Sequence, residues 1–297
     1  MRKNIRTILA LTFVSGLALT YSCKKTVEYE DLPEVSAADK VYLDSTAKAQ
    51  ALLTNVYTVV HTEVSNVEDQ SFKTDGISGL GLPTDPNIEI TSEVDSTDKA
   101  NKYLKKVTLD FKNGVGSDYD KRKYGKIIVT KNGRIDKKGT VCTITFDKFS
   151  VGHDHNSMTG TITLENKGFL NGVYTMKLTM TNGTYRTCEG ALYGAGPQDG
   201  LINMNLDLTI ELTVTSGNYK ISMSGTQTFD YKNTEYVEFY STPLTMTDVC
   251  SYITDGAKEL KDSSGKKKII DYGDGSCDNK ATVIENNKTY RYNVYWL

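Results

Sequence analysis

Most of the chain consists of short stretches in which apolar and polar residues alternate, which is the period of half-buried β-strands. The alternating stretches cover residues 107–111, 141–146, 160–164, 174–180 and 206–214. Dipeptides that adopt positive φ readily, such as Asn113-Gly114 and Asn182-Gly183, separate them. Because no helical pattern intervenes, residues 101–297 are predicted to form a mainly β domain of many antiparallel strands, folded as a β-sandwich, a barrel or one long curved sheet.

A different period precedes these strands. Ser36 and Asp39 have the spacing of a helix cap, and apolar residues then recur every three or four positions from Leu52 to Val64. This pattern predicts one N-terminal α-helix over residues 36–66. Residues 67–100 are rich in Gly, Asp, Ser and Thr and contain two prolines, so we expect an irregular linker there.

The first residues have the order of an export signal. Arg2, Lys3 and Arg6 precede an apolar stretch, residues 8–19, which is long enough for the core of a signal peptide and short for a membrane-spanning helix. Residues 19–23, Leu-Thr-Tyr-Ser-Cys, resemble the lipobox of bacterial lipoproteins, although Thr20 stands where that motif prefers an aliphatic residue. Residues 1–22 are therefore predicted to be a lipoprotein signal peptide, with lipid such as palmitate attached at Cys23. The alternative is an ordinary secretory leader, and both readings predict export.

Charge narrows the choice of partners. Removing residues 1–22 takes away three of the 35 basic residues and none of the 37 acidic ones, so the formal net charge changes from −2 to −5. The basic runs, residues 121–123 and 266–268, are short, and we expect no nucleic-acid partner. Residues 23–35 mix charge with Pro33 and lack periodicity, as a tether does. Their acidic patch resembles the export tags of surface lipoproteins of Bacteroidota, which implies a surface-exposed outer membrane lipoprotein.

Parts of the β domain echo one another. Residues 157–161, Ser-Met-Thr-Gly-Thr, return as Ser-Met-Ser-Gly-Thr at 222–226, and residues 106–111 return in similar form at 267–272. The first and last of these four segments resemble each other, and so do the two in the middle. The repeats of a solenoid instead follow one another in tandem. Two readings are open: two related halves of one sheet system, or similar hairpins that use similar residues.

Two further stretches resemble a family of uncharacterised Bacteroidota envelope lipoproteins. These are residues 107–147, with Leu-Asp-Phe at 109–111 and Lys-Tyr-Gly-Lys-Ile-Ile-Val-Thr at 123–130, and the closing hairpin at 270–283, with Asp-Tyr-Gly-Asp-Gly-Ser-Cys-Asp-Asn at 271–279. The resemblance covers about residues 103–297 and implies location and fold. It brings no activity with it.

Setting Cys23 aside leaves four cysteines, which can pair in three ways. We expect a disulfide between Cys250 and Cys277, because both lie in the half that resembles the family and a hairpin could bring their strands together. This choice leaves Cys142 and Cys188 as a second pair, with free thiols as the alternative.

Metal binding has two weak candidates. Asp271, Asp274, Asp278 and Asn279 crowd a glycine-bearing turn with oxygen ligands that calcium prefers, but their spacing is not that of an EF-hand. A tight turn that uses Asp and Gly for their backbone tolerance is favoured over a cation site. His153 and His155 alternate around Asp154 without a third ligand in view. No cofactor is predicted.

Two classes of function stay open. The first is a non-catalytic surface binding or structural module, whose tyrosine-bearing sheet face contacts a glycan or an envelope protein, because Tyr outnumbers Phe by 19 to 8 and suits a sheet with one wet face. The second is a glycan-acting hydrolase, in which Asp110 and Asp271, at equivalent places in the echoed strands, converge as a carboxylate pair. The first is preferred.

Overall fold

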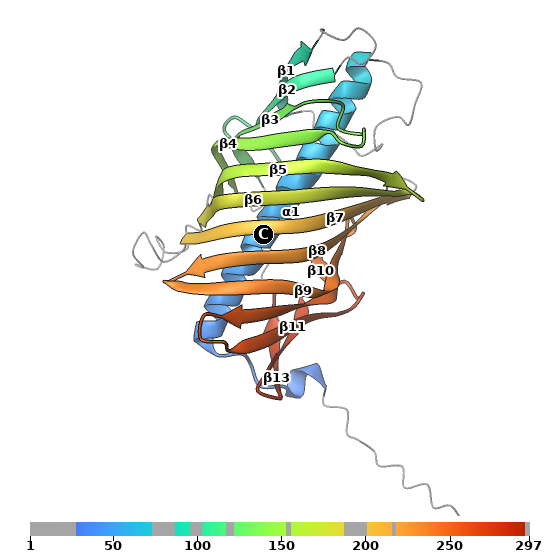
Figure 1. Cartoon of the computed structure of the whole chain (residues 1–297). Helices are drawn as coiled ribbons and strands as arrows, with labels where there is room; N and C mark the ends of the chain where they lie inside the picture. The colour runs from blue at the N-terminus through green and yellow to red at the C-terminus, as the bar shows by residue number, and fades with distance from the viewer. Residues whose placement is uncertain are drawn as a thin grey trace, which may run out of the picture.

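The computed structural model describes residues 28–72, 87–95, 103–116, 122–152, 156–186, 201–215 and 218–294. One long helix and thirteen strands make up this part of the chain (Figure 1). Their bounds are η1 Tyr29–Asp31, α1 Ala37–Phe72, β1 Glu89–Asp95, β2 Tyr103–Asp110, β3 Lys123–Lys131, β4 Val141–Val151, β5 Asn156–Leu170, β6 Val173–Arg186, β7 Leu201–Thr215, β8 Asn218–Tyr231, β9 Thr234–Thr247, β10 Cys250–Asp262, β11 Lys267–Asp274, β12 Lys280–Glu285 and β13 Lys288–Asn293.

All thirteen strands form one open antiparallel sheet in which each strand pairs with the next along the chain. In β7 the alternation predicted from the sequence matches the burial of the side chains, because Leu206, Leu208 and Ile210 are buried while Asp207 is exposed. The mainly β prediction is therefore confirmed, and the long curved sheet is the version of it that the chain adopts.

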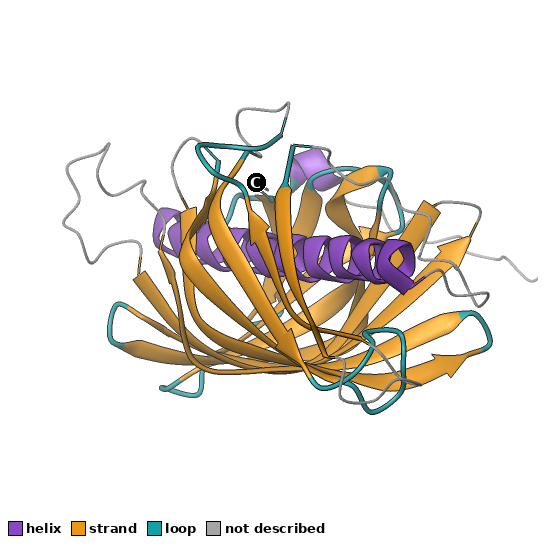
Figure 2. Ribbon diagram, turned by 90° about the horizontal axis from the view of Figure 1, so that it is seen from above, coloured by secondary structure: helices purple, strands orange, loops and turns teal. Residues whose placement is uncertain are grey.

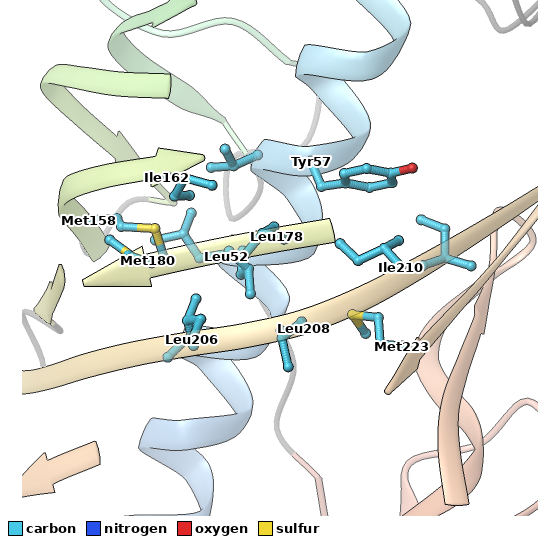
Figure 3. Packing of buried hydrophobic residues seen from close by; sticks show 14 of the residues in the cluster. Leu52, Tyr57, Met158, Ile162, Leu178, Met180, Leu206, Leu208, Ile210 and Met223 are labelled. Atoms are coloured by element: carbon cyan, nitrogen blue, oxygen red, sulfur yellow. The ribbon is translucent and has the colours of Figure 1, made fainter. Parts of the chain in front are cut away.

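The helix α1 lies in the hollow of the curved sheet and crosses its strands obliquely (Figures 1 and 2). The cap predicted from Ser36 and Asp39 is present, since the Asp39 backbone N–H donates to Ser36 Oγ and the Ser36 hydroxyl donates to the Asp39 carboxylate. On the side that faces the sheet, Leu52 and Tyr57 pack against apolar residues of the central strands (Figure 3). The helix therefore fills the concave face and shares one core with the sheet.

The helix continues to Phe72, beyond the predicted end at residue 66. The additional turns carry polar residues, which is why their pattern did not indicate a helix. Their partners come from β3 and from the connection between β3 and β4, because Glu68 pairs with Lys131 and Asp69 pairs with Arg134. Tertiary contacts thus extend the helix past its apolar stripe.

The predicted linker, residues 67–100, is partly regular as well. Besides the end of α1 it contains β1, an edge strand that pairs with β2 along its length and leaves most of its residues exposed. An exposed edge strand has few apolar residues, so its sequence does not differ from that of a loop. Residues 73–86 and 96–100 lie outside the described part of the chain.

Curvature enters the sheet at interruptions of the strand register. The pairing of β8 with β9 shifts between Met223 and Thr226, around Gly225 at φ +127°. A Cβ at Gly225 would lie 2.3 Å from the Asp207 carbonyl oxygen of β7, so no other residue fits without a backbone shift. Bulges of this kind bend and twist a sheet, which lets this one wrap the helix.

The opposite edge of the sheet is partly covered by the segment that precedes α1. The Arg291 N–H of β13 donates to the Pro33 carbonyl, and the Val35 N–H donates to the Arg291 carbonyl. The Arg291 guanidinium also pairs with the carboxylates of Glu30 and Glu34. Residues 28–35 of the predicted tether are therefore docked on the body.

The sequence echoes occupy related places in the sheet. One pair of echoed segments falls on β5 and β8, and the other falls on β2 and β11, so both pairs are centred between β6 and β7. Met158 and Met223, at matching places in the first pair, are both buried between sheet and helix. The similar segments thus lie in similar packing environments within one continuous sheet. That the two halves are related stays a prediction.

Candidate functional site

Two buried polar clusters hold the ends of α1 to the sheet. Under its first half, Lys258 Nζ lies 3.0 Å from both carboxylate oxygens of Glu238, and neither side chain is more than 3% exposed. The Tyr42 hydroxyl donates to Glu238, and the Tyr240 hydroxyl donates to Gln50 of the helix. Burial acts to lower the pKa of Lys258, but Glu238 more than offsets it, so that pKa is raised.

The second cluster lies under the last turns of the helix. Glu68 accepts the ammonium of Lys131 and the backbone N–H groups of Leu104 and Ile135. Burial lowers the pKa of Lys131, against the opposing effect of Glu68. Because both clusters are closed off from solvent by helix and sheet, their groups fix the packing and are out of reach of a substrate.

His61 sits between these clusters on the inner face of the helix. It is 2% exposed, and within the described part of the chain neither ring nitrogen has a hydrogen-bond partner. The rings of Tyr57 and Tyr174 pack on it, and burial lowers its pKa to about 4. A neutral, packed histidine of this kind is part of the core.

The convex, open face of the sheet differs in composition from the tyrosine-bearing face that the sequence predicts. Tyrosines largely point inward, against the expectation of a tyrosine-bearing wet face, and none in the described part is fully exposed. The buried ones are Tyr42, Tyr57, Tyr174, Tyr185, Tyr231, Tyr240, Tyr272 and Tyr292. Large rings fill the layer between helix and sheet. The hydroxyls of Tyr42, Tyr240 and Tyr292 donate to polar side chains there, whereas those of Tyr57 and Tyr231 have no hydrogen-bond partner among the described residues. The convex face carries mainly Thr, Ser, Asn and charged residues instead.

A groove of about 290 Å³ opens across β6 to β9 at one end of these strands. Its lining residues are Asn182, Gly183, Asn203, Met204, Asn205, Thr228, Phe229, Asp230 and Glu235. The groove begins where β6 bulges between Met180 and Gly183, which puts Asn182 at φ +54°. The Asn182 N–H donates to Asn205 Oδ1 at 2.8 Å, and Asn205 Nδ2 donates to Thr228 Oγ1 at 3.2 Å. These bonds fix one wall.

The other wall holds polar groups without protein partners. Asp230 and Glu235 face each other across the β8–β9 hairpin, and Asn203 is the neighbour of Asp230 on β7. Among the described residues, no hydrogen bond or ion pair involves any of these three side chains. Two carboxylates directly opposite each other in a sheet repel, so this arrangement costs stability. It leaves unpaired polar atoms accessible in a hollow of the surface.

The groove was not found from the sequence. Asn203, Asn205 and Asp207 alternate with buried apolar residues, which identified a strand with a polar face and no more. The signal that could have indicated a site is an Asp and a Glu flanking the Lys232-Asn233 turn at paired positions, where like charges are unfavourable.

Comparison with family models, curated proteins and solved structures finds no match. The groove and its surroundings therefore have to be interpreted from their own chemistry. The predicted lipid attachment site, Cys23, lies outside the described residues. Among the helices of the described part, none combines the length and apolar character that crossing a bilayer requires.

The proposed catalytic pair does not assemble. Asp110 on β2 and Asp271 on β11 both lie on the convex face, since their neighbours Leu109 and Ile270 are buried under the helix. Nine strand positions separate β2 from β11, which is roughly 43 Å along the sheet. Side chains on a convex surface diverge, so the two carboxylates cannot act on one bond. Asp110 instead pairs with Lys126 at 3.0 Å.

In the weak calcium candidate, the carboxylates accept hydrogen bonds from their own turns. The carboxylate of Asp271 accepts the Gly273 N–H, and that of Asp278 accepts the Lys280 N–H. Asp274 accepts both the N–H and the hydroxyl of Ser276, and these bonds lower its pKa. The described residues hold no group of three or more acidic, His or Cys side chains around one point. His153 and His155 lie outside the described part.

One of the two predicted disulfides is present. Cys250 and Cys277 are bonded, with Cα atoms 5.7 Å apart, and they tie the β9–β10 turn to the connection between β11 and β12. This pairing is confirmed.

The prediction that Cys142 pairs with Cys188 is not supported, because Cys142 is a free, buried thiol. Cys142 lies near the start of β4, level with Leu164 and Leu178 across the sheet. Strand β6 continues from Leu178 to Arg186, roughly 25 Å farther toward the other end of the strands. Cys188 itself lies outside the described residues. Burial raises the pKa of Cys142 to about 12.

Proposed function

We propose that this protein is an exported, lipid-anchored envelope protein that works as a non-catalytic binding module, with the convex face of its sheet as the binding surface. The observation that carries this proposal is the division between the two faces. The concave face is filled by α1 over its described length, and its polar groups are sealed inside. The convex face is open and holds a groove in which the side chains of Asn203, Asp230 and Glu235 have no partner among the described residues.

Independent features support this location. The leader and the lipobox-like residues 19–23 support attachment at Cys23 of an outer membrane lipoprotein. The Cys250–Cys277 disulfide is typical of an oxidising compartment. Residues 28–35, docked on β13, would then connect the anchor directly to the folded body.

Binding is favoured over hydrolysis by the character of the available carboxylates. Asp110 and Asp271 do not converge, and Asp230 and Glu235 are both exposed. A glycosidase needs one carboxyl group held in a desolvated environment that keeps it protonated. Asp230 and Glu235 are exposed to water rather than desolvated, and hydrogen bonding to a ligand needs only accessible oxygens.

The anchor is tested by metabolic labelling with a fatty-acid analogue in the native host. The full chain should incorporate label, and a Cys23→Ala variant should lose it because the acceptor thiol is gone. Label that persists in the variant would refute attachment at Cys23.

The binding function is tested with the chain from residue 24 onward, mixed with isolated, insoluble envelope material from the host. Saturable retention of the protein, with envelope glycans recovered at unchanged size by mass spectrometry, is the expected result. Shortened glycans would instead support the hydrolase alternative, and the absence of saturable retention would contradict the binding module.

A further inference from the structure

The groove across β6 to β9 continues into an apolar column on the same face. Glu235, Val237 and Phe239 alternate along β9 with buried residues, so all three point outward. Val237 is 41% exposed and Phe239 is 51% exposed, which is unusual for side chains of their size in the middle of a strand. At about 3.3 Å per residue, Phe239 lies about 13 Å from Glu235.

The register joins the column to the groove. Glu235 pairs with Asp230, Val237 pairs with Thr228, and Phe239 pairs with Thr226. Asp230, Glu235 and Thr228 all line the groove. One continuous strip of surface therefore runs from two carboxylates and an amide, past a hydroxyl, to an exposed aromatic ring.

This juxtaposition suits one class of ligand. A sugar presents hydroxyl groups around its rim, which donate to carboxylates and exchange hydrogen bonds with amides, and an apolar face of C–H groups, which packs on an aromatic ring. We propose that the strip formed by Asn203, Asp230, Glu235, Val237 and Phe239 is a binding site for neutral or amine-bearing oligosaccharides. This inference rests on the proposed binding function and names its site and ligand class.

The charge of the strip sets its selectivity. Asp230 and Glu235 form no ion pair among the described residues, so an acidic sugar would bring a third negative charge into the groove. Hydroxyl or ammonium groups of a ligand satisfy the same carboxylates. We therefore expect neutral and amine-bearing glycans to bind, and uronic-acid or sulfated glycans to be rejected.

The test begins with an array of neutral, amine-bearing, uronic-acid and sulfated oligosaccharides and the chain from residue 24 onward. The best ligand is then titrated by calorimetry against Asp230→Asn/Glu235→Gln and against Phe239→Ser. Matched controls are Glu211→Gln, an exposed carboxylate on β7 beyond the groove, and Leu170→Ser, an exposed apolar residue at the β5–β6 turn. Thermal unfolding of each variant checks that it is folded.

We expect each site variant to bind at least tenfold more weakly and each control to bind within twofold of the unaltered chain. The Asp230→Asn/Glu235→Gln variant should also melt no lower than the unaltered chain, because it removes a repulsive pair, so its loss of binding cannot reflect unfolding.

Three results would overturn the inference: a blank array, binding confined to acidic glycans, or site variants that bind like the controls. A fourth is saturable calcium binding, titrated with CaCl₂ alone, that is lost in Asp230→Asn/Glu235→Gln while no sugar binds. Because envelope retention and Cys23 labelling are measured separately, any of these results can occur while the binding module itself stands.

Discussion

His61 shows what a single buried side chain contributes to the response to pH. Its pKa is lowered to about 4 by burial against Tyr57 and Tyr174, while the nearby Asp136 acts weakly in the other direction. In the unfolded chain a histidine has a pKa of about 6.5. Between these values the unfolded state binds a proton that the folded state refuses, so stability falls as the pH decreases from about 6.5 to about 4.

This linkage predicts the behaviour of a His61→Phe variant. The difference in unfolding free energy between pH 7 and pH 4 should be smaller in the variant by about 3 kcal/mol, because the ring no longer titrates. Urea denaturation at a series of pH values measures it. Carboxylates with lowered pKa values, such as Asp39 and Asp110, destabilise both proteins equally in acid and cancel in the comparison. Identical pH profiles would show that His61 is not buried in its neutral form.

The buried pair Glu238–Lys258 gives a second prediction at this scale. A Lys258→Met substitution leaves the Glu238 carboxylate sealed in the core without a cation and should cost about 3 to 5 kcal/mol of unfolding free energy. Adding Glu238→Gln should recover most of that loss, because the amide is neutral and still accepts the Tyr42 hydroxyl.

The matched control for that pair is the exposed pair Glu259–Lys267 on the convex face. Lys267→Met should change the unfolding free energy by less than about 1 kcal/mol, since water screens exposed charges. Equal costs at positions 258 and 267 would contradict the burial of the first pair.

At the scale of elements, the shape of the sheet depends on close approaches that only glycine permits. Gly225 of β8 lies against the Asp207 carbonyl of β7, whereas Gly172, in the β5–β6 turn, also has positive φ but faces open space. Gly225→Ala should destabilise the protein by about 1 to 3 kcal/mol more than Gly172→Ala. Both substitutions place an alanine at an unfavourable positive φ, but only the first also brings a Cβ into a steric clash. Urea denaturation of the two variants measures the difference. Equal losses would mean that the approach of β7 to β8 is not tight.

These elements also show how far the sequence can be interpreted. Alternation located strands such as β7, and Ser36 with Asp39 located the start of α1, because these signals are local. The helix end at Phe72 and the edge strand β1 were missed, since Lys131, Arg134 and β2 stabilise them from a distance. The choice of one open sheet depends on bulges, and the bend that they produce together cannot be calculated from the alternation of apolar and polar residues.

The same distinction applies to the candidate sites. The Cys250–Cys277 pair was predicted, and it joins neighbouring turns of one end of the sheet. The groove was not predicted, because Asn203, Asp230 and Glu235 come from three strands. They form a group only when the register of those strands aligns them. The pairing of Asp110 with Asp271 failed for the converse reason: equivalent positions in echoed strands are distant when the strands lie far apart in one sheet.

For the whole molecule, the disulfide is the one covalent constraint that the described part contains. It joins residues 27 positions apart, so a Cys250→Ser/Cys277→Ser variant should lose about 3 to 4 kcal/mol of unfolding free energy through greater freedom of the unfolded chain. Urea denaturation measures the loss, and the unaltered chain treated with reductant should unfold at the same urea concentration as the variant. A reduced chain as stable as the oxidised one would show that the bond is not formed.

The docked segment before α1 determines how the whole molecule would stand on a membrane. If Cys23 carries lipid, only residues 24–27 separate it from Glu28, so the β13 edge stays within about 18 Å of the acyl chains. Thirteen strands spaced about 4.8 Å apart measure about 58 Å along the curve, which places β1 at the far end. The sheet would then serve as an upright spacer of fixed height. It would carry the groove, four to seven strands up from β13, clear of the bilayer and facing sideways into the surrounding medium.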